Sequence, residues 1–309
     1  MKAIRLHARG GPEQVIYEDA PEPILLDGDA LVKVLASGTT RNELEWGPTY
    51  TDEKGNDRTP TIPGHELCGI VEAITPAVTD MLVGETVYGL TSFFRNGTAA
   101  EFIAVHAADL APAPLSIDPV QAASVPLSAL TAWQALFDHG HLLPGQKVLI
   151  HGAAGGVGSF AVQIASWHGA HVITTASAEN NTLLKELGAQ QCIDYKKQRF
   201  EELVNGVDVV LDCVGGDTQD RSWQVLRQGG VLVTIAGESV EQPAADLGVR
   251  GIFFIVKASR IQLMEIGSLI DRGFIKPIVA DVLPIEQARR AFEMGLESGR
   301  KGKIVLRVG

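Results

Sequence analysis

The residues best suited to chemistry lie in one glycine-rich segment, 147–165, which reads K-V-L-I-H-G-A-A-G-G-V-G-S-F-A-V-Q-I-A. A strand of the buried type runs into the glycines, and an apolar helix follows them. Gly155, Gly156 and Gly158 permit a tight turn and let backbone N–H groups approach a pyrophosphate, which the positive end of the helix also attracts. Ala153 replaces the usual first glycine, so close packing of helix and sheet without a ligand is the alternative. The context favours a dinucleotide-binding turn.

The end of the next expected strand indicates which dinucleotide binds. A site for NAD places Asp or Glu about 20 residues after the glycines, where the carboxylate bonds the ribose hydroxyls. Here the strand ends T-T-A-S-A-E-N-N, with Ser177 in that neighbourhood and Glu179 a little later, inside the turn. The missing carboxylate removes a ribose partner and a charge that repels a 2′-phosphate, so we expect NADPH. Use of both cofactors is the alternative, because the loop has no Arg and Lys185 is either close to the phosphate or simply exposed.

Two regions with different sequence patterns must position these residues. Up to about residue 110, short β-like runs alternate with clusters of Gly, Pro, Asp and Asn, which is typical of an antiparallel, barrel-like β domain. From Pro119, strands alternate with helices, which predicts βαβ units and a parallel sheet. The last strand is expected to rejoin the β domain. We expect strands at 30–36, 69–74, 86–88, 99–105, 147–151, 170–175, 207–212, 231–236 and 303–308, helices at 120–139, 160–167, 181–187, 217–226 and 261–272, and an apolar stretch at 251–256.

Composition narrows the function classes. The chain has 309 residues, 45% hydrophobic and 20% charged, which is ordinary for a globular protein of two domains. A net charge of −11 argues against nucleic acid and anionic membranes as partners. Cys68, Cys192 and Cys213 show no C-x-x-C spacing, so neither a disulfide framework nor a cysteine-rich zinc site is expected. Without a secretory leader pattern or a membrane-spanning run, we expect a cytoplasmic protein.

Dispersed motifs carry a family resemblance over essentially the whole chain. Besides the glycine-rich turn, they are P-G-H-E-L-C-G-I-V at 63–71, G-E-T-V-Y-G-L at 84–90, S-A-L-T-A-W-Q-A-L at 128–136, L-G-A-Q-Q-C-I-D-Y at 187–195, D-V-V-L-D-C-V-G-G at 208–216 and the closing G-K-I-V-L. The chain resembles the zinc-free, quinone oxidoreductase-like branch of the medium-chain dehydrogenase/reductase superfamily. The resemblance implies an α/β fold: a GroES-like β-barrel domain (1–112 and 265–309), a Rossmann NADP-binding domain (113–264), and the active site in the cleft between them.

Zinc-dependent members of this superfamily hold a catalytic metal with three protein ligands and an open position. Of those ligands only His65 is present, because A-S-G-T-T-R-N-E and V-P-L-S-A-L-T-A, which match the other two ligand regions, contain no thiol or carboxylate at the required place. The four-cysteine structural lobe is absent as well. We therefore expect no metal, and we interpret His65 and Glu66 as hydrogen-bonding partners in a buried turn.

The resemblance also implies which residues line the cofactor. Tyr195 is expected near the 2′-phosphate and Thr131 against the nicotinamide. The complete set is Tyr50, Thr131, Ala154, Gly155, Gly156, Val157, Ser177, Tyr195, Val214, Gly215, Ile235, Ala236, Gly237, Phe253, Phe254 and Ile255.

The catalytic candidates are fewer. Thr40 and Glu43 match an Asn and an Asp of the family, which puts in doubt any mechanism that needs an Asn beside the nicotinamide, although threonine can still hydrogen-bond. For Glu43, a buried carboxylate that accepts from backbone N–H groups is favoured over a general acid. Tyr50 and solvent are the candidate proton donors, with Tyr50 equally suited to be a wall of the cleft. Cys213 is expected to be an inert packing residue.

These observations predict an NADPH-dependent, zinc-independent oxidoreductase that transfers hydride to quinones or related electron-poor small molecules. An NADPH-dependent enal or enone reductase is the alternative within enzymes. A non-catalytic NADPH-binding sensor or a structural protein is the alternative from another class, because a fold does not guarantee chemistry. The apolar run G-I-F-F-I-V-K at 251–257 is either a strand that pairs across a two-fold axis in a homodimer or a strand buried within one chain.

Overall fold

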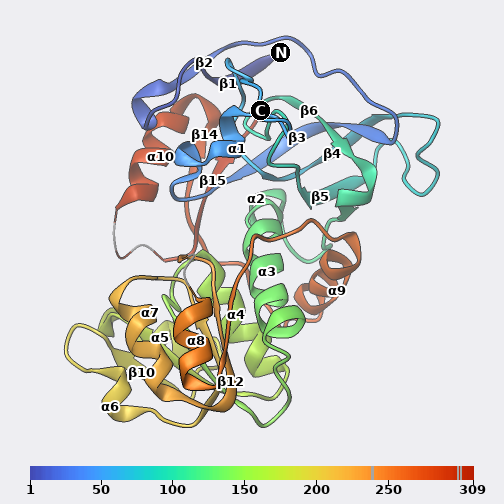
Figure 1. Ribbon diagram of the computed structural model, residues 1–309. Helices are drawn as coiled ribbons and strands as arrows, with labels where there is room; N and C mark the ends of the chain where they lie inside the picture. Colours follow the sequence, from blue (N-terminus) through green and yellow to red (C-terminus); the bar gives the residue numbers. More distant parts are fainter. Residues whose placement is uncertain (238–239, 298, 300) are drawn as a thin grey trace. The chain divides into compact units, whose positions relative to one another are not determined.

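The computed structural model describes residues 1–237, 240–297, 299 and 301–309 (Figure 1). The chain forms two compact units, which are described separately. Unit 1 comprises Met1–Leu127, Lys257–Gly273 and Pro277–Gly309, and unit 2 comprises Ser128–Val256 and Phe274–Lys276.

Unit 1 is built on β-sheet. Its main sheet has the order β14-β15-β3-β4-β5-β7, with β6 paired to β3, and β1 and β2 form a separate two-stranded sheet. The final strand, β15, pairs antiparallel with β3, which confirms that the end of the chain rejoins the β domain. The strands are β1 (Lys2–Leu6), β2 (Val15–Asp19), β3 (Asp29–Thr39), β4 (Glu66–Ile74), β5 (Thr86–Leu90), β6 (Phe102–His106), β7 (Leu110–Pro112), β14 (Val279–Pro284) and β15 (Lys303–Arg307).

Alternation of side chains gives unit 1 its core. Along β3, Ala30, Val32 and Val34 are buried and Lys33 between them is exposed, the period of two that a strand with one buried face requires. The helices of this unit are α1 (Gly47–Tyr50), α2 (Pro119–Ala123), α9 (Arg260–Asp271) and α10 (Ala288–Leu296).

The boundaries between the units differ from the sequence prediction. The first lies after Leu127 rather than after residue 112, because α2 packs against β3 and β4 of the main sheet. The second lies after Val256 rather than after residue 264, because α9 belongs to unit 1. The hydroxyl of Tyr88 on β5 donates to the carbonyl of Leu263, and the carboxylate of Asp271 accepts from the Ser116 N–H at 2.8 Å.

Unit 2 is a parallel sheet with the order β10-β9-β8-β11-β12-β13. Numbered along the chain, this is 3-2-1-4-5-6, the doubly wound order of dinucleotide-binding folds. The expected strands at 147–151 and 207–212 coincide with β8 and β11. The strands are β8 (Lys147–His151), β9 (His171–Ala176), β10 (Gln191–Asp194), β11 (Val207–Asp212), β12 (Leu226–Thr234) and β13 (Arg250–Phe253), and the helices are α4 (Gly156–Trp167), α5 (Asn181–Glu186), α6 (Phe200–Leu203), α7 (Asp217–Ser222) and α8 (Glu241–Leu247).

The single helix expected at 120–139 is interrupted. After α2, residues Ser124 and Val125 leave the helix and α3 (Pro126–Trp133) begins, continuing as a π-helix over Gln134–His139. Pro126 causes the break, because its ring lacks an N–H and disfavours the helical conformation of the residue before it.

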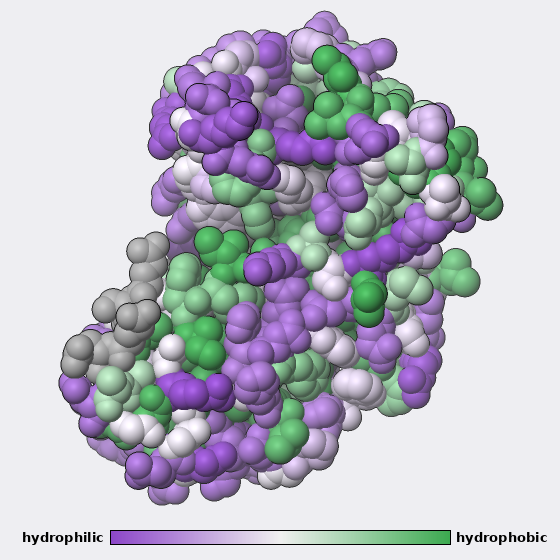
Figure 2. All heavy atoms as spheres, turned by 45° about the vertical axis from the view of Figure 1, so that its right-hand side comes forward, coloured by the Kyte–Doolittle hydropathy of each residue, from purple (hydrophilic) through white to green (hydrophobic). Residues whose placement is uncertain are grey.

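The surface mixes both kinds of side chain. Figure 2 shows hydrophilic residues over much of the visible face, with apolar residues in separate groups among them. Several large apolar side chains are exposed, among them Ile24, Leu115 and Ile261. Within the described residues, none of the helices has both the length and the apolar character needed to cross a bilayer.

Candidate functional site

The carboxyl ends of the parallel strands bring most of the expected cofactor residues together at one edge of the unit 2 sheet. In an open α/β sheet, ligands bind outside this edge, where the strand order reverses. Here the reversal lies between the neighbouring strands β8 and β11, because the chain continues from β8 to β9 on one side and from β11 to β12 on the other. The expected residues follow the strands directly: Ala154–Val157 after β8, Ser177 after β9, Tyr195 after β10, Val214 and Gly215 after β11, Ile235–Gly237 after β12, and Phe254 and Ile255 after Phe253 of β13.

The glycine-rich turn presents the amino end of helix α4. The helix starts at Gly156, and its N-cap, Gly155, offers no side chain to the first N–H groups. These groups and the helix dipole form a site for an anion. A side chain at Gly158 would place its Cβ 2.6 Å from Ala153 Cα and closer still to the Gly152 carbonyl, so this glycine lets the helix pack on the turn.

Asp212 organises the two neighbouring turns. Its side chain is fully buried at the end of β11, where Oδ1 accepts from the N–H groups of Val214 and Gly215 at 2.9 and 3.0 Å. Its other oxygen accepts from the hydroxyl of Thr234 on β12 at 3.0 Å. Gly215 has φ +78°, and a Cβ there would lie 2.9 Å from the Ala236 carbonyl. The carboxylate thus fixes the backbone of two expected cofactor segments.

Ser177 lies where the sequence placed it, but a carboxylate accompanies it. The Ser177 hydroxyl donates to Glu179 Oε1 at 2.9 Å and accepts from Asn180 Nδ2 at 3.0 Å. Glu179 is exposed, so its charge is available at the end of β9. Beside it, the Tyr195 N–H donates to the Ala176 carbonyl at 3.3 Å, and Tyr195 is exposed, as are Lys196 and Lys197 after it.

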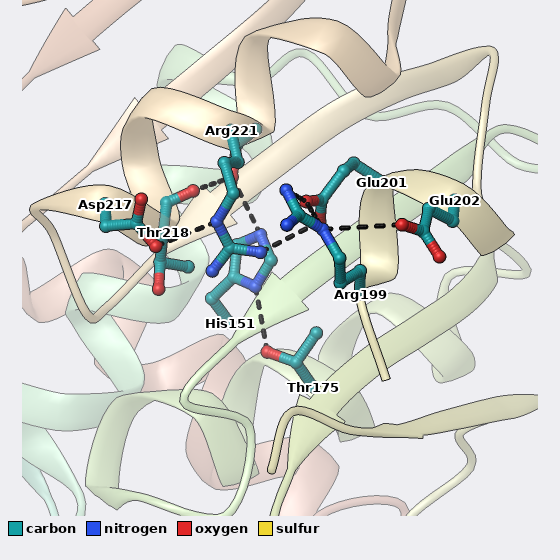
Figure 3. A network of polar contacts seen from close by, with 9 residues as sticks. His151, Thr175, Arg199, Glu201, Glu202, Asp217, Thr218 and Arg221 are labelled. Atoms are coloured by element: carbon teal, nitrogen blue, oxygen red, sulfur yellow. Dashed lines mark hydrogen bonds and ion pairs between the residues drawn. The ribbon is translucent and has the colours of Figure 1, made fainter. Parts of the chain in front are cut away.

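A buried histidine, His151, comes directly before the glycine-rich turn, and Figure 3 shows its contact with Thr175. His151, the last residue of β8, is fully buried between the Thr175 hydroxyl on β9 (Nδ1, 2.8 Å) and the Ser222 hydroxyl on α7 (Nε2, 2.9 Å). Because the Ser222 proton goes to the Thr218 carbonyl, Nε2 of the histidine carries hydrogen and Nδ1 accepts from Thr175. Burial lowers the pKa of His151, which keeps the ring neutral.

An outer ion-pair network covers this histidine (Figure 3). Arg221 lies 2.8 Å from Glu201 and 2.9 Å from Asp217, and its guanidinium lies over the Phe200 ring. The Phe200 ring in turn contacts His151, with 4.6 Å between ring centroids. The network joins α6 to α7 and, through the Phe200 ring, contacts His151 at the end of β8.

The remaining candidates lie elsewhere. Thr131 is buried on α3 in unit 2, whereas Thr40 and Tyr50 belong to unit 1. Tyr50 is only 2% exposed, and its hydroxyl donates to the Leu44 carbonyl at 2.7 Å. Since that proton is engaged with the backbone, this hydrogen bond opposes the expected role of Tyr50 as a proton donor and gives it a part in holding its own loop. Its expected place beside the cofactor stays a prediction.

Glu43 is a buried carboxylate that orders the loop after β3. Its oxygens accept from the Thr40 N–H at 2.7 Å and from the Gly64 N–H at 3.1 Å. This confirms the interpretation of Glu43 as a backbone-bonded carboxylate. Burial raises the pKa of Glu43 to about 7, against the opposing effects of Lys303 and the Thr40 N–H.

Lys303, Glu66 and Thr40 form a second group in unit 1. Lys303 Nζ lies 2.6 Å from Glu66 Oε1 and donates to Thr40 Oγ1 at 3.0 Å. The other Glu66 oxygen accepts from the Leu127 N–H at 2.9 Å. Lys303 and Glu66 are almost completely buried, whereas Thr40 is only half-buried. Lys303 therefore places a positive charge within hydrogen-bond distance of the Thr40 hydroxyl.

The residues around His65 do not fit a zinc ion. Among the described residues, no cluster of three or more His, Cys, Asp or Glu side chains has the arrangement of a metal site. The His65 ring stacks on Trp46 and contacts Phe93, with centroid distances of 5.7 and 4.8 Å, and neither ring nitrogen has a hydrogen-bond partner in the part of the chain that the structure describes. Burial lowers the pKa of His65 to about 3. The expected hydrogen bonds of His65 through its ring are thus not made.

Cys213 follows β11. Burial raises the pKa of its thiol above the usual value, and the charge of Asp212 acts in the same direction. Because the thiolate is the reactive form, this environment suits a packing residue.

Sequence reasoning missed four residues that organise these sites: His151, Asp212, Glu66 as an ion-pair partner, and Lys303. Asp212 did carry a signal, since a carboxylate at the end of the apolar strand V-D-V-V-L-D is unusual unless it is hydrogen-bonded. Lys303 carried little signal, because a lysine at a strand end is ordinarily exposed.

Known proteins share this architecture. The model of the alcohol dehydrogenase GroES-like domain matches residues 26–115, and that of the zinc-binding dehydrogenases matches residues 187–306. A probable zinc-binding oxidoreductase, mitochondrial, of Arthroderma benhamiae is 32% identical over 93% of this chain and 91% of its own. The NADPH-dependent alkenal/one oxidoreductase of Arabidopsis thaliana, chloroplastic, is 31% identical over 92% of this chain and 73% of its own. The quinone oxidoreductase structure from Coxiella burnetii superposes with a TM-score of 0.93 at 30% identity, covering 100% of this chain and 99% of its own.

Proposed function

This chain belongs to the medium-chain dehydrogenase/reductase superfamily, in its quinone oxidoreductase-like branch, and from that premise we propose that it is an NADPH-dependent, zinc-independent enzyme that transfers hydride to quinones or related electron-poor acceptors. The observation that carries the proposal is the uncapped amino end of α4, at the point where the order of the parallel sheet reverses. Such an edge binds the pyrophosphate of a dinucleotide.

Bound there, NADPH supplies the hydride, and the protein supplies orientation and electrostatics. The backbone N–H groups at Gly156 and Val157 would hold the pyrophosphate. Asp212 fixes the turn at Val214 and Gly215, which follows β11, the neighbour of β8 in the sheet. This turn would contact the part of the cofactor next to the pyrophosphate. His151 keeps β8 and β9 in place beneath the glycine-rich turn without introducing a charge.

Zinc independence is supported by the surroundings of His65. A catalytic zinc needs three protein ligands, and the neighbours of this ring are the aromatic side chains Trp46 and Phe93. Acceptors that take hydride without a Lewis acid, such as quinones and α,β-unsaturated carbonyls, suit this site. Metal analysis of purified, unchelated protein tests the point, and stoichiometric zinc would contradict it.

The preference for NADPH is supported by Ser177 and by the exposed Lys196 and Lys197, whereas the Glu179 carboxylate opposes it. Replacing Ser177→Asp adds a ribose partner and a charge that repels a 2′-phosphate, so the ratio of kcat/KM for NADPH to that for NADH should fall. Glu179→Gln removes a negative charge from the same place and should raise the ratio. If the ratio of kcat/KM for NADPH to that for NADH is unchanged in both variants, Ser177 and Glu179 do not determine the cofactor preference.

The decisive experiment measures NADPH oxidation by metal-free enzyme, with 9,10-phenanthrenequinone and separately with 1-octen-3-one. Turnover with the quinone supports the main proposal. Turnover with the enone alone supports an enal or enone reductase instead, an activity that the name of the Arabidopsis relative also carries. Saturable NADPH binding without turnover of either acceptor would favour a non-catalytic sensor or a structural protein.

We also propose a homodimer formed through β13. Among the described strands, β13 is at the edge of its sheet, so one row of its backbone N–H and C=O groups has no neighbouring strand there, and Ile255 just beyond it is 65% exposed. Pairing with a second copy across a two-fold axis would satisfy the edge. Light scattering of wild type and Ile252→Pro tests this, because proline removes a ladder N–H. A monomeric wild type would refute it. The cytoplasmic location stays a prediction that cell fractionation checks.

A further inference from the structure

The chain contains two Asn-Gly sequences, Asn96-Gly97 in unit 1 and Asn205-Gly206 in unit 2. In such a pair, the backbone nitrogen of the second residue can attack the side-chain amide carbon of the asparagine. Glycine hinders this attack least, because no side chain lies beside its nitrogen. The remaining asparagines, at positions 42, 56, 180 and 181, are followed by Glu, Asp, Asn and Thr. Which Asn-Gly pair reacts therefore depends on how the fold holds each of them.

Asn205-Gly206 lies in the connection between α6 and β11. Both residues are exposed, and they follow the buried Val204 outside any helix or strand. Within the described part of the chain, neither the Asn205 side chain nor the Gly206 N–H has a hydrogen-bond partner. Gly206 has φ +63°, and a Cβ built on it would meet no atom within 4 Å. The nitrogen, the amide and the space around them are therefore free for a reaction.

Asn96-Gly97 has the same sequence but is held by the fold. The Gly97 N–H donates to the Ile62 carbonyl at 2.7 Å. Asn96 Oδ1 accepts from the Ile62 N–H at 3.3 Å and from the Thr61 hydroxyl at 3.4 Å. Gly97 is buried, and neighbouring carbonyls leave no room for a Cβ on it. To react, this pair must break the hydrogen bonds of both its nitrogen and its amide oxygen.

We propose that Asn205 is a site of spontaneous deamidation, and that the fold exposes this asparagine to the reaction while it protects Asn96. The Gly206 nitrogen forms a bond to Cγ of Asn205 and loses its proton. The Cγ–Nδ2 bond breaks, and the NH₂ group leaves with that proton as ammonia. The product is a cyclic imide.

Water then opens the imide at one of its two carbonyls. One opening gives aspartate, and the other gives isoaspartate, in which the main chain runs through the side-chain carbonyl. Water is the sole co-reactant and nothing is oxidised or reduced, so the step does not depend on the proposed hydride transfer. Either product adds one negative charge to a chain whose net charge is −11. Isoaspartate also lengthens the main chain between α6 and β11.

The test incubates the purified chain at pH 8, where loss of the glycine N–H proton is favoured, and follows two peptides by mass spectrometry after digestion at low pH. Exchange of NH₂ for OH raises the mass of a peptide by one unit, and chromatography separates its aspartate and isoaspartate forms. One net hydrogen bond is worth roughly 5-fold, so the bonds of Asn96-Gly97 should make its conversion at least ~10-fold slower than that of Asn205.

Two controls separate the fold from the sequence. In urea that unfolds the chain, both pairs lose their contacts, so the rates of conversion at Asn205 and Asn96 should converge. Asn205→Gln is the matched variant, because it keeps the exposed amide and adds one methylene, which makes the ring harder to close. In this variant, the peptide that contains residue 205 should keep its mass, while the peptide that contains Asn96 should behave as in wild type.

The outcomes decide the proposal. Conversion of Asn96 as fast as that of Asn205 in the folded chain overturns it, as does an Asn205 peptide that keeps its mass in the folded chain. A difference of the same size in urea also overturns it, because the neighbouring sequence rather than the fold would then set the rates. Since no acceptor or cofactor is present in these incubations, a failure of the proposed function in the NADPH assay leaves this result unaffected.

Discussion

Replacing Glu43→Gln should remove one part of the pH dependence of stability. The folded chain gives this carboxyl a pKa of about 7, whereas the unfolded value is 4.5. Between these values the folded chain binds the proton more tightly, so wild type loses stability as pH rises from about 4.5 to 7, by about 3 kcal/mol in all. Glutamine does not titrate, so the variant lacks this loss.

At pH 4.5 the variant should be slightly less stable than wild type. Its amide NH₂ faces one of two backbone N–H donors, Thr40 or Gly64, at a cost of about 1 kcal/mol. At pH 8 the order should reverse, and the variant should be more stable by about 2 kcal/mol. Urea unfolding followed by tryptophan fluorescence, repeated from pH 4.5 to 8, gives both values.

The matched control is Glu45→Gln, which removes an exposed carboxylate from the same short 3-10 helix, Glu43–Glu45. It separates the effect of net charge from the effect of burial. A difference between wild type and Glu43→Gln that stays constant from pH 4.5 to 8 would refute the reasoning, because burial would then not disfavour the charged form of this carboxyl.

Two further predictions concern unit 2. Gly158→Ala should destabilise the protein by about 2 kcal/mol, because its Cβ would overlap the backbone of the preceding turn, and should weaken NADPH binding in a fluorescence titration. Gly155→Ala, whose Cβ would meet only the Gly152 carbonyl at 3.3 Å, should cost less than about 1 kcal/mol. His151→Ala removes the acceptor of the buried Thr175 hydroxyl and the donor to the buried Ser222 hydroxyl, leaves a cavity, and should cost about 3 kcal/mol. Because its pKa is lowered in the fold, wild type should lose stability as pH falls below about 6.5, and His151→Ala should lose less in the same urea series.

The sequence predicted best those parts of the fold that local chemistry determines. Strands β8 and β11 were predicted at their observed bounds because each is a short apolar run between turn residues. The turn between β8 and α4 was predicted because glycines between an apolar strand and an apolar helix indicate a tight turn. Strand β10 and helix α10 were missed, since β10 has only four residues and α10 owes its position to packing against β15 and β2.

The candidate sites divide in the same way. Residues that follow parallel strands share an edge whenever the strands form one sheet, so the order of elements was enough to place Ser177 and Gly215 together. Tyr50 shows the opposite case. Its family position suggested a proton donor or a wall of the cleft, but its hydroxyl donates to a carbonyl six residues away in its own loop, which opposes the donor role. A local contact of this kind has no pattern in the sequence.

The contact between Lys303 and Thr40 shows why the register of strand pairing determines which side chains meet. Lys303 and Thr40 are 263 residues apart, and their contact depends on one antiparallel pairing. A slip of that pairing by one residue would turn Lys303 to the other face of the sheet. The sequence predicted that the last strand rejoins the β domain, but not its register, so Lys303 was indistinguishable from an exposed lysine at a strand end.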